Sequence, residues 1–184
     1  MPEARQLTRP ELEAGLDAIR QSPRDEGVLE LIVRRPRTDE REVLEEGQLD
    51  PAEGLVGDNW KARGTAGGWQ PAIPDRQLTL MNARVIALLA QTKERWPLAG
   101  DQLFVEFDLS AANVPAGTRL AVGSAVVEVT APPHTGCKKF TERFGADAMA
   151  FVNSPVWKLL QLRGVHAKVV KPGLVRTGDA VKKL

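Results

Sequence analysis

The residues best equipped for chemistry lie in one short segment, PPHTGCKKFTERFG, at positions 132–145. It holds the only cysteine of the chain, Cys137, and one of its two histidines, His134. A thiolate is a nucleophile and a metal ligand, and cations such as Lys138 and Lys139 favour it over the neutral thiol. A helix that begins near Lys138 would add free backbone N–H groups at the same place. The segment therefore predicts an anion bound beside a sulfur atom.

Two less specific explanations of this segment stay open. A free cysteine is often a buried, small apolar side chain, and adjacent lysines are more often solvated surface than a site. His134 and Cys137 also have the spacing of a zinc-binding pair. A structural zinc site needs four ligands, however, and His166 with one carboxylate would complete it only in a contrived way. The pattern does not favour zinc.

Composition narrows the class of protein. The chain has 184 residues, 42% of them hydrophobic and 27% charged, which is typical of one globular domain. A net charge of +1 gives no reason to expect nucleic acid or an anionic membrane as a partner. One cysteine fits a reducing compartment, and the charged N-terminus lacks the apolar centre of a signal peptide. The longest apolar run, at 85–90, is too short to span a bilayer. We expect a soluble, cytoplasmic protein.

Alternating and β-branched residues predict that much of the chain is strand. The predicted strands lie at 28–36, 40–47, 76–82, 103–110, 119–130, 164–170 and 174–184. Pro36, Thr38 and Asp39 would connect the first two strands as a hairpin. Gly123 lies inside the fifth and suggests a bulge or a sharp bend.

Helical periodicity is confined to three regions. Residues 8–20 begin with a capping-box spacing, Asn82 can cap a helix that runs to Trp96, and one or two short helices fall in 137–161. Residues 54–75 hold five glycines and are typical of an ordered loop. Their GTAGG run neither follows a clear strand nor opens a clear helix, so it does not indicate dinucleotide binding.

Strands dominate, their spacing is irregular, and no strand–helix–strand rhythm runs through the chain. The sequence therefore predicts a mainly β fold, a closed or nearly closed β-barrel with a few inserted helices.

Several segments, taken in order, resemble the MOSC domain, which is named for the C-terminal part of molybdenum cofactor sulfurases. The matching segments are GLVGD (54–58), RQLTLMN (76–82), DQLFVEFDLS (101–110), LAVGSAVVEVTAPPHTGC (120–137) and LRGVHAKVVKPGLVRTGDAV (162–181). A cysteine after V-E-V-T, followed by R-G-V, G-x-V and G-D, is the specific part of the resemblance.

The resemblance implies a MOSC or pyruvate-kinase-barrel-like fold and binding of the molybdenum cofactor, a pterin with a phosphate tail and a dithiolene that chelates the metal. It implies that Cys137 carries sulfur or ligates molybdenum, for which a soft thiolate is suited. The phosphate requires cations and backbone donors. The residues that the resemblance and the basic segment suggest for cofactor binding are Asp58, Arg76, His134, Thr135, Lys138, Lys139, Arg143 and Arg163.

The resemblance also implies one MOSC domain over residues 1–184, in which 1–50 supplies an N-terminal helix and a hairpin that pack onto the barrel. Three features depart from the family pattern. Many members have Glu-Asn where this chain has Asp101-Gln102, and their Pro-Cys is stretched here to PHTGC. The loop TERFGADAMAFVNSPVW, at 141–157, is unlike that of the amidoxime-reducing members.

Three functions from different classes stand as hypotheses. In the first, the protein binds the molybdenum cofactor and uses Cys137 as a sulfur carrier or molybdenum ligand, with a sulfurase as partner. In the second, it is a molybdoenzyme that reduces N-oxygenated compounds with electrons from a partner protein, because one cysteine cannot hold an iron–sulfur cluster. In the third, it is a cofactor-free barrel with a thiol redox or ligand-binding role. Pyridoxal phosphate belongs to a partner domain of larger family members, and we expect no role for it here.

Overall fold

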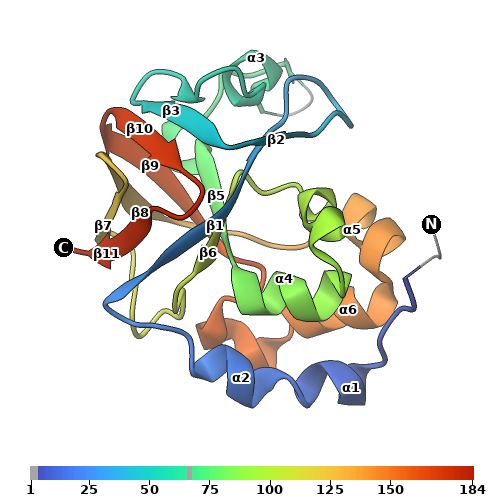
Figure 1. Cartoon of the computed structure of the whole chain (residues 1–184). Helices are drawn as coiled ribbons and strands as arrows, with labels where there is room; N and C mark the ends of the chain where they lie inside the picture. The colour runs from blue at the N-terminus through green and yellow to red at the C-terminus, as the bar shows by residue number, and fades with distance from the viewer. Residues whose placement is uncertain (1–3, 66–67) are drawn as a thin grey trace.

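The computed structural model describes residues 4–65 and 68–184 and contains a closed β-barrel, with most helices packed on one side and α3 apart from them (Figure 1). The barrel wall consists, in spatial order, of β11 (Ala180–Lys183), β7 (Arg119–Val122), β8 (Ala125–Pro133), β9 (Val165–Lys171), β5 (Leu78–Asn82), β6 (Leu103–Glu106) and β1 (Glu26–Arg34). Pairing of β1 with β11 closes the ring. β5 and β6 run parallel and the other neighbours in the ring are antiparallel. The predicted mainly β barrel is confirmed.

A second, small sheet lies beside the barrel. It consists of β10 (Gly173–Arg176), β3 (Glu46–Asp50) and β4 (Gly54–Leu55). β2 (Glu42–Leu44) instead extends the barrel sheet beyond β1, with which it forms the predicted hairpin. The single strand predicted at 40–47 is therefore wrong. The strand is interrupted at Glu45 because the chain changes its pairing partner there, from β1 to β10.

The strand predicted at 119–130 is a hairpin of two strands, β7 and β8. Val122 pairs with Ala125, so Gly123 lies in the two-residue turn between them, which confirms the predicted sharp bend and not the bulge. Its φ of 54° is a left-handed conformation that glycine adopts without strain.

Short helices fill the connections. They are α1 (Arg9–Glu13), α2 (Leu16–Arg20), α3 (Trp60–Arg63), α4 (Ala83–Ala90), α5 (Lys138–Phe144) and α6 (Ala146–Val152), with 3-10 turns η2 (Pro74–Arg76), η3 (Lys93–Ala99) and η4 (Pro155–Leu160). Within the part of the chain that the structure describes, no helix has the length and apolar character needed to cross a bilayer.

The helices differ from the predictions in two ways: one ends early at a left-handed residue, and one short helix was not predicted. Asn82 caps α4 as predicted, its side chain accepting from the Arg84 N–H, but the helix ends at Ala90 because Gln91 adopts φ 64°. The helix predicted at 8–20 is the pair α1 and α2. Residues 54–75 are mostly loop but include β4 and α3, and two residues of the GTAGG run, 66–67, lie outside the described residues.

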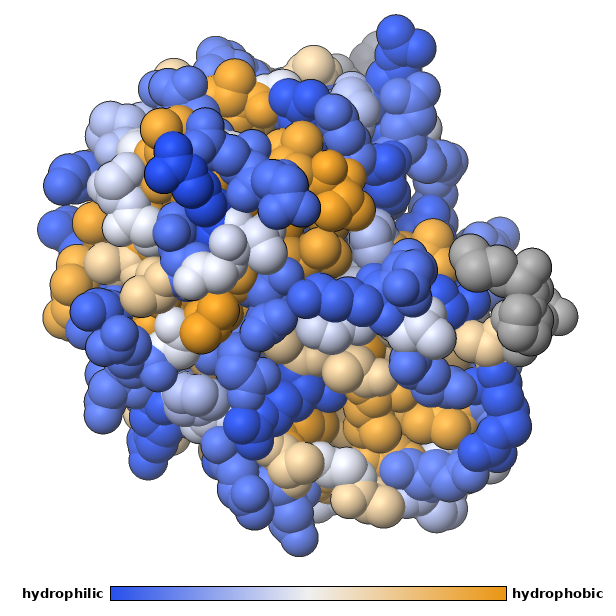
Figure 2. Space-filling view, viewed as in Figure 1, coloured by the Kyte–Doolittle hydropathy of each residue, from blue (hydrophilic) through white to orange (hydrophobic). Residues whose placement is uncertain are grey.

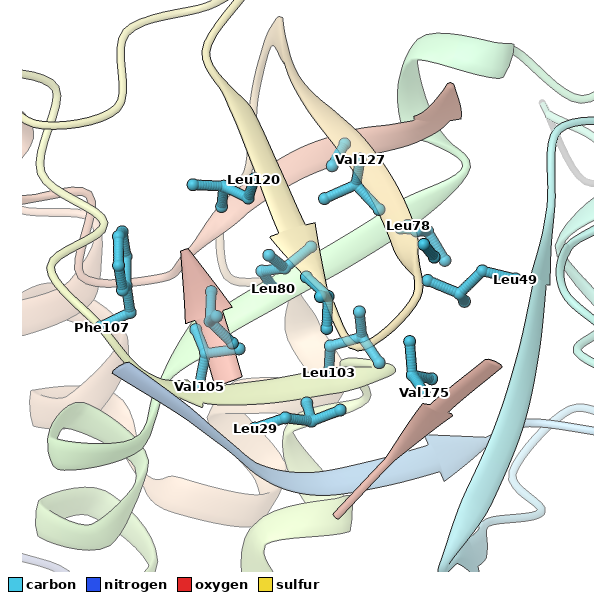
Figure 3. Close-up of a cluster of buried hydrophobic side chains, with 14 of the residues drawn as sticks. Leu29, Leu49, Leu78, Leu80, Leu103, Val105, Phe107, Leu120, Val127 and Val175 are labelled. Atoms are coloured by element: carbon cyan, nitrogen blue, oxygen red, sulfur yellow. The ribbon is translucent and has the colours of Figure 1, made fainter. Parts of the chain in front are cut away.

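The protein has two hydrophobic cores, one inside the barrel and one between the barrel and the helices. Leu29, Leu80, Leu103 and Val127 point into the barrel with other aliphatic side chains (Figure 3). The predicted alternation in β6 is confirmed, because Phe104 turns outward between two inward neighbours and joins the core beneath the helices.

Candidate functional site

A pocket of about 740 Å³ lies against the outer face of the barrel, between β5 and β9 on one side and α5 and the β1–β2 hairpin on the other. Thr79 and His166 are paired across β5 and β9, and both line the pocket. Leu80 and Ala167, their neighbours along the strands, belong to the barrel core. Because side chains alternate along a strand, Thr79 and His166 must point outward, which places the pocket outside the barrel.

The pocket is strongly cationic although the whole chain has a net charge of only +1. The cationic side chains that line it are Arg35, Arg37, Arg41, Arg63, Arg76, Lys139, Arg143 and Arg163. Asp39 is the one carboxylate among the described residues that line the pocket. Clustering, and not net charge, therefore creates an anion-attracting surface.

Arg35 lines the pocket and is held in place by a buried ion pair. Its Nε and Nη2 donate to the two carboxylate oxygens of Asp58, each at 2.8 Å, and its Nη1 donates to the Gly100 carbonyl at 2.9 Å. The Asp58 side chain is fully buried and does not line the pocket. Asp58 also accepts from the backbone N–H groups of Arg35 and Trp60, so it joins β1 to the start of α3.

Arg163 has an equivalent partner in Asp101. Its Nη1 donates to Asp101 Oδ2 at 2.7 Å, its Nη2 donates to the Ala99 carbonyl at 2.8 Å, and its guanidinium lies 4.9 Å from the centre of the Phe140 ring. Burial raises the pKa of Asp101, and Arg163 opposes that rise. The next residue, Gly164, packs directly against the backbone of β5. It has φ 101°, and a Cβ there would lie 2.1 Å from the Leu80 carbonyl oxygen.

Asp101 and Gln102 support the pocket from inside the protein. The Gln102 side-chain oxygen Oε1 accepts from the backbone N–H and the hydroxyl of Thr79, at 2.9 and 2.7 Å. Its amide donates to the Gln77 carbonyl at 3.2 Å. Both side chains are buried, so they position the pocket floor and do not face a ligand directly.

Three arginines of the pocket have no carboxylate partner. Among residues 4–65 and 68–184, no Asp or Glu oxygen lies within 4.0 Å of Arg41, Arg63 or Arg76. Burial lowers the pKa of Arg41, with Arg143 and Arg35 contributing, and burial and Arg35 lower the pKa of Arg63. Arginine stays charged regardless, so Arg41 and Arg63 are repelled by neighbouring arginines, and a bound anion would relieve that repulsion.

His134 and His166 form a neutral pair on the pocket floor. Their ring centres are 4.7 Å apart, and neither Nδ1 atom has a hydrogen-bond partner within the described residues. Burial, followed by the nearby Arg163 and His166, lowers the pKa of His134 well below its usual value. Burial and then Arg76 lower the pKa of His166 to about 4. The His134 ring is therefore uncharged at neutral pH and adds no positive charge beside Cys137.

Cys137 is exposed and lies on the pocket wall, immediately before α5. α5 begins at Lys138, as predicted. Gly136 holds the loop close to α6, since its N–H donates to Asn153 Oδ1 at 2.9 Å and a Cβ on it would lie 2.5 Å from the Met149 sulfur. The thiol thus has a defined place at the edge of a cationic pocket, which excludes the interpretation of Cys137 as a buried core residue.

The sequence-derived candidates divide into three groups. The structure brings Arg76, His134, Thr135, Cys137, Lys139, Arg143 and Arg163 together around the pocket. Asp58 lies behind the wall and acts through Arg35. Lys138 points to solvent, with 90% of its side chain exposed and Glu142 as its nearest acid at 3.9 Å.

Several lining residues were not identified from the sequence. The main group is Arg35, Arg37 and Arg41, within RRPRTDER at the tip of the β1–β2 hairpin. Four arginines in eight residues were a visible signal. The local sequence predicts only a strand and a turn for them, because nothing in it shows that this hairpin tip faces α5.

Comparison with protein families gives one match, the MOSC domain, over residues 71–182. No curated protein matches the chain. Among solved structures, the YuaD protein of Bacillus subtilis is similar at a TM-score of 0.61 and 19% identity, with 86% of this chain and 95% of that chain covered. YiiM of Escherichia coli is similar at a TM-score of 0.54 and 21% identity, with coverages of 85% and 69%. YiiM of Geobacillus stearothermophilus has a TM-score of 0.52 and 11% identity, with coverages of 89% and 74%. At these identities the structures support the fold alone.

Proposed function

The chain belongs to the MOSC domain family, and from this membership we propose that its cationic pocket binds the molybdenum cofactor, with Cys137 as sulfur carrier or molybdenum ligand. The family is generally associated with that cofactor. The observation that carries the proposal for this chain is the placement of its only thiol on the wall of a pocket lined by eight cationic side chains.

The residues of the pocket fit such a group in size and in chemistry. A volume of about 740 Å³ is within the range of cofactor sites. Arg41, Arg63 and Arg76 offer charge for a phosphate without first breaking an ion pair. The rings of His134 and His166 also line the pocket beside these cations.

Each part of the chain would then have a distinct task. The arginines hold the phosphate, the buried Asp58 and Asp101 keep Arg35 and Arg163 in place, and Cys137 presents sulfur at the pocket edge. The bound group supplies the metal and its redox chemistry. The proposal includes a sulfurase or an electron-transfer protein as partner and the reducing cytoplasm as location, where a free thiol persists.

The test is to express the chain in a host that makes the molybdenum cofactor and to measure molybdenum and pterin per chain after gentle purification. We expect both near stoichiometric amounts, and a clear loss of molybdenum in Cys137→Ala. Arg76→Met and Lys139→Met should lower pterin content as well. Lys138→Met is the matched control, because it removes the same charge from the adjacent residue, which faces solvent.

If Cys137→Ala retains as much molybdenum and pterin as the natural chain, the protein is a cofactor carrier and Cys137 is not a ligand. Equal retention in Lys139→Met and Lys138→Met would contradict the assigned pocket. If the loaded protein reduces amidoximes when supplied with an electron-donor protein, the enzymatic alternative replaces simple carriage.

The exposure of Cys137 favours one second candidate, a cofactor-free thiol redox role. It predicts no molybdenum or pterin in any variant, together with reversible oxidation of Cys137. Mass spectrometry after mild peroxide treatment and reduction by a thiol would detect that oxidation.

A further inference from the structure

The tip of the β1–β2 hairpin reaches across to α5 through a single carboxylate. Asp39 Oδ1 accepts a hydrogen bond from Lys139 Nζ and lies 3.3 Å from Arg143 Nη2. The two cations are one helical turn apart on α5 and both line the pocket. Figure 2 shows hydrophilic side chains gathered at the upper right, where Figure 1 places the hairpin tip.

The geometry of Asp39 is that of an anion held between two donors. Lys139 is the main cause of its lowered pKa, so the carboxylate is ionised at neutral pH. Its backbone is left-handed, with φ 65°, which is uncommon outside glycine although asparagine and aspartate tolerate it best. The side chain is 58% exposed, so water and other anions can compete for its two partners.

A phosphate or carboxylate group would be recognised by the same two side chains. Lysine and arginine donate charge-assisted hydrogen bonds to either group, and arginine does so through a fork of N–H donors. Arg143 is held for this task from behind, because its Nη1 donates to the Leu98 carbonyl at 2.8 Å. Arg41, at the other end of the hairpin tip, adds positive charge.

We propose that Lys139 and Arg143 form an anion-binding subsite of the pocket, which the Asp39 carboxylate and an anionic group of the ligand occupy in turn. Binding there displaces Asp39 and releases residues 36–40 from α5. The hairpin tip is then a strap that opens for anionic ligands. This inference rests on the pocket of the proposed function being an anion site, but it does not depend on molybdenum or on Cys137.

The test measures the affinity of the full chain for inorganic phosphate by isothermal titration calorimetry at low salt. Asp39→Asn keeps the shape of the side chain and removes the competing charge. We expect it to bind phosphate about twofold to fivefold more tightly than the natural chain, the range that corresponds to one exposed ion pair. Lys139→Met should weaken binding.

Glu42→Gln is the matched control. It removes one negative charge from the same hairpin, but Glu42 is paired with Arg34 and does not line the pocket. If Asp39→Asn and Glu42→Gln change the affinity for phosphate equally, the change reflects only the overall charge of the protein, and the proposal is overturned. Unchanged or weaker binding in Asp39→Asn, or no phosphate binding by any variant, would overturn it too.

A second readout follows the strap directly. The Glu40 N–H donates to the Arg37 carbonyl within the hairpin tip, at 3.1 Å. Its NMR signal should shift on addition of phosphate, toward its position in Asp39→Asn without phosphate. A fixed signal while phosphate binds would show that no displacement occurs. The phosphate probe contains neither metal nor pterin. The strap can therefore be confirmed even if the protein binds no molybdenum cofactor, and cofactor binding can be confirmed even if the strap is not.

Discussion

Arg35 and Asp58 form a two-point ion pair at the wall of the pocket, with Nε on one carboxylate oxygen and Nη2 on the other, each at 2.8 Å. Arg35 is 10% exposed and Asp58 is fully buried. The two residues are 23 positions apart, and they join the end of β1 to the segment that begins α3. The pair therefore sets the positions of two pocket walls.

Replacing Asp58 with Asn should destabilise the fold. The change leaves the Arg35 charge largely buried without a partner, and loss of one member of a buried pair costs about 3–5 kcal/mol. Urea unfolding followed by tryptophan fluorescence would measure the change in the free energy of unfolding. Glu42→Gln, which breaks the exposed pair with Arg34, should cost about 0–1 kcal/mol. Similar costs for both variants would contradict the structural role given to Asp58.

Gly164→Ala should be more damaging than a glycine substitution of equal backbone strain. A Cβ at this position would lie 2.1 Å from the Leu80 carbonyl oxygen, which is backbone and cannot rotate away. Gly117 has a comparable φ of 93°, and its added Cβ would meet nothing within 4 Å. Gly117→Ala should therefore cost only the strain, about 1–3 kcal/mol, and Gly164→Ala should exceed it. Thermal unfolding of both variants tests the order, and the reverse order would refute the close packing.

His166 should make the protein less stable on acidification. Its pKa is about 4 in the folded chain and near 6.5 when unfolded, so the unfolded state binds more protons between these values. Stability from this residue is therefore complete above about pH 6.5 and is lost as pH falls toward 4, at up to about 1.4 kcal/mol per pH unit. Urea unfolding at pH 7 and pH 5 measures the loss.

The matching variant for this pH effect is His166→Gln, which cannot titrate. It should lose less stability than the natural chain between pH 7 and pH 5. Comparing the two slopes also removes the contribution of Asp101, whose raised pKa acts in the opposite direction. Parallel slopes would show that His166 is not a buried neutral group.

Cys137 should react with an anionic reagent in a strongly salt-dependent way. The pocket cations attract a negatively charged aromatic disulfide, and salt screens that attraction. We expect its rate to fall about tenfold between low and high salt, as measured by absorbance of the released thiolate. Neutral iodoacetamide is the control, since it reports any effect of salt on the thiol itself. Equal salt dependence of the two reagents would argue against the cationic pocket around this residue.

Local patterns in the sequence determined the elements and the chemistry of the main candidates. Alternation in β6, the Asn82 cap and the helix start at Lys138 follow from neighbouring residues, because period, capping and backbone preference act over a few positions. Cys137 and its basic segment were likewise identified from neighbouring residues alone. The short range of these patterns also explains the errors, since the break at Glu45 depends on a pairing with β10, about 130 positions away in the chain.

Only the tertiary structure decided which charges meet. The run RRPRTDER gave no local sign that Asp39 would reach Lys139, 100 positions later, or that Arg35 would be paired with Asp58. Lys138 and Lys139 are neighbours of the same type, yet one faces solvent and the other the pocket. Helical rotation of about 100° per residue points the two side chains in different directions. The packing of α5 against α6 and η3, which depends on long-range burial, decides which of the two faces the pocket.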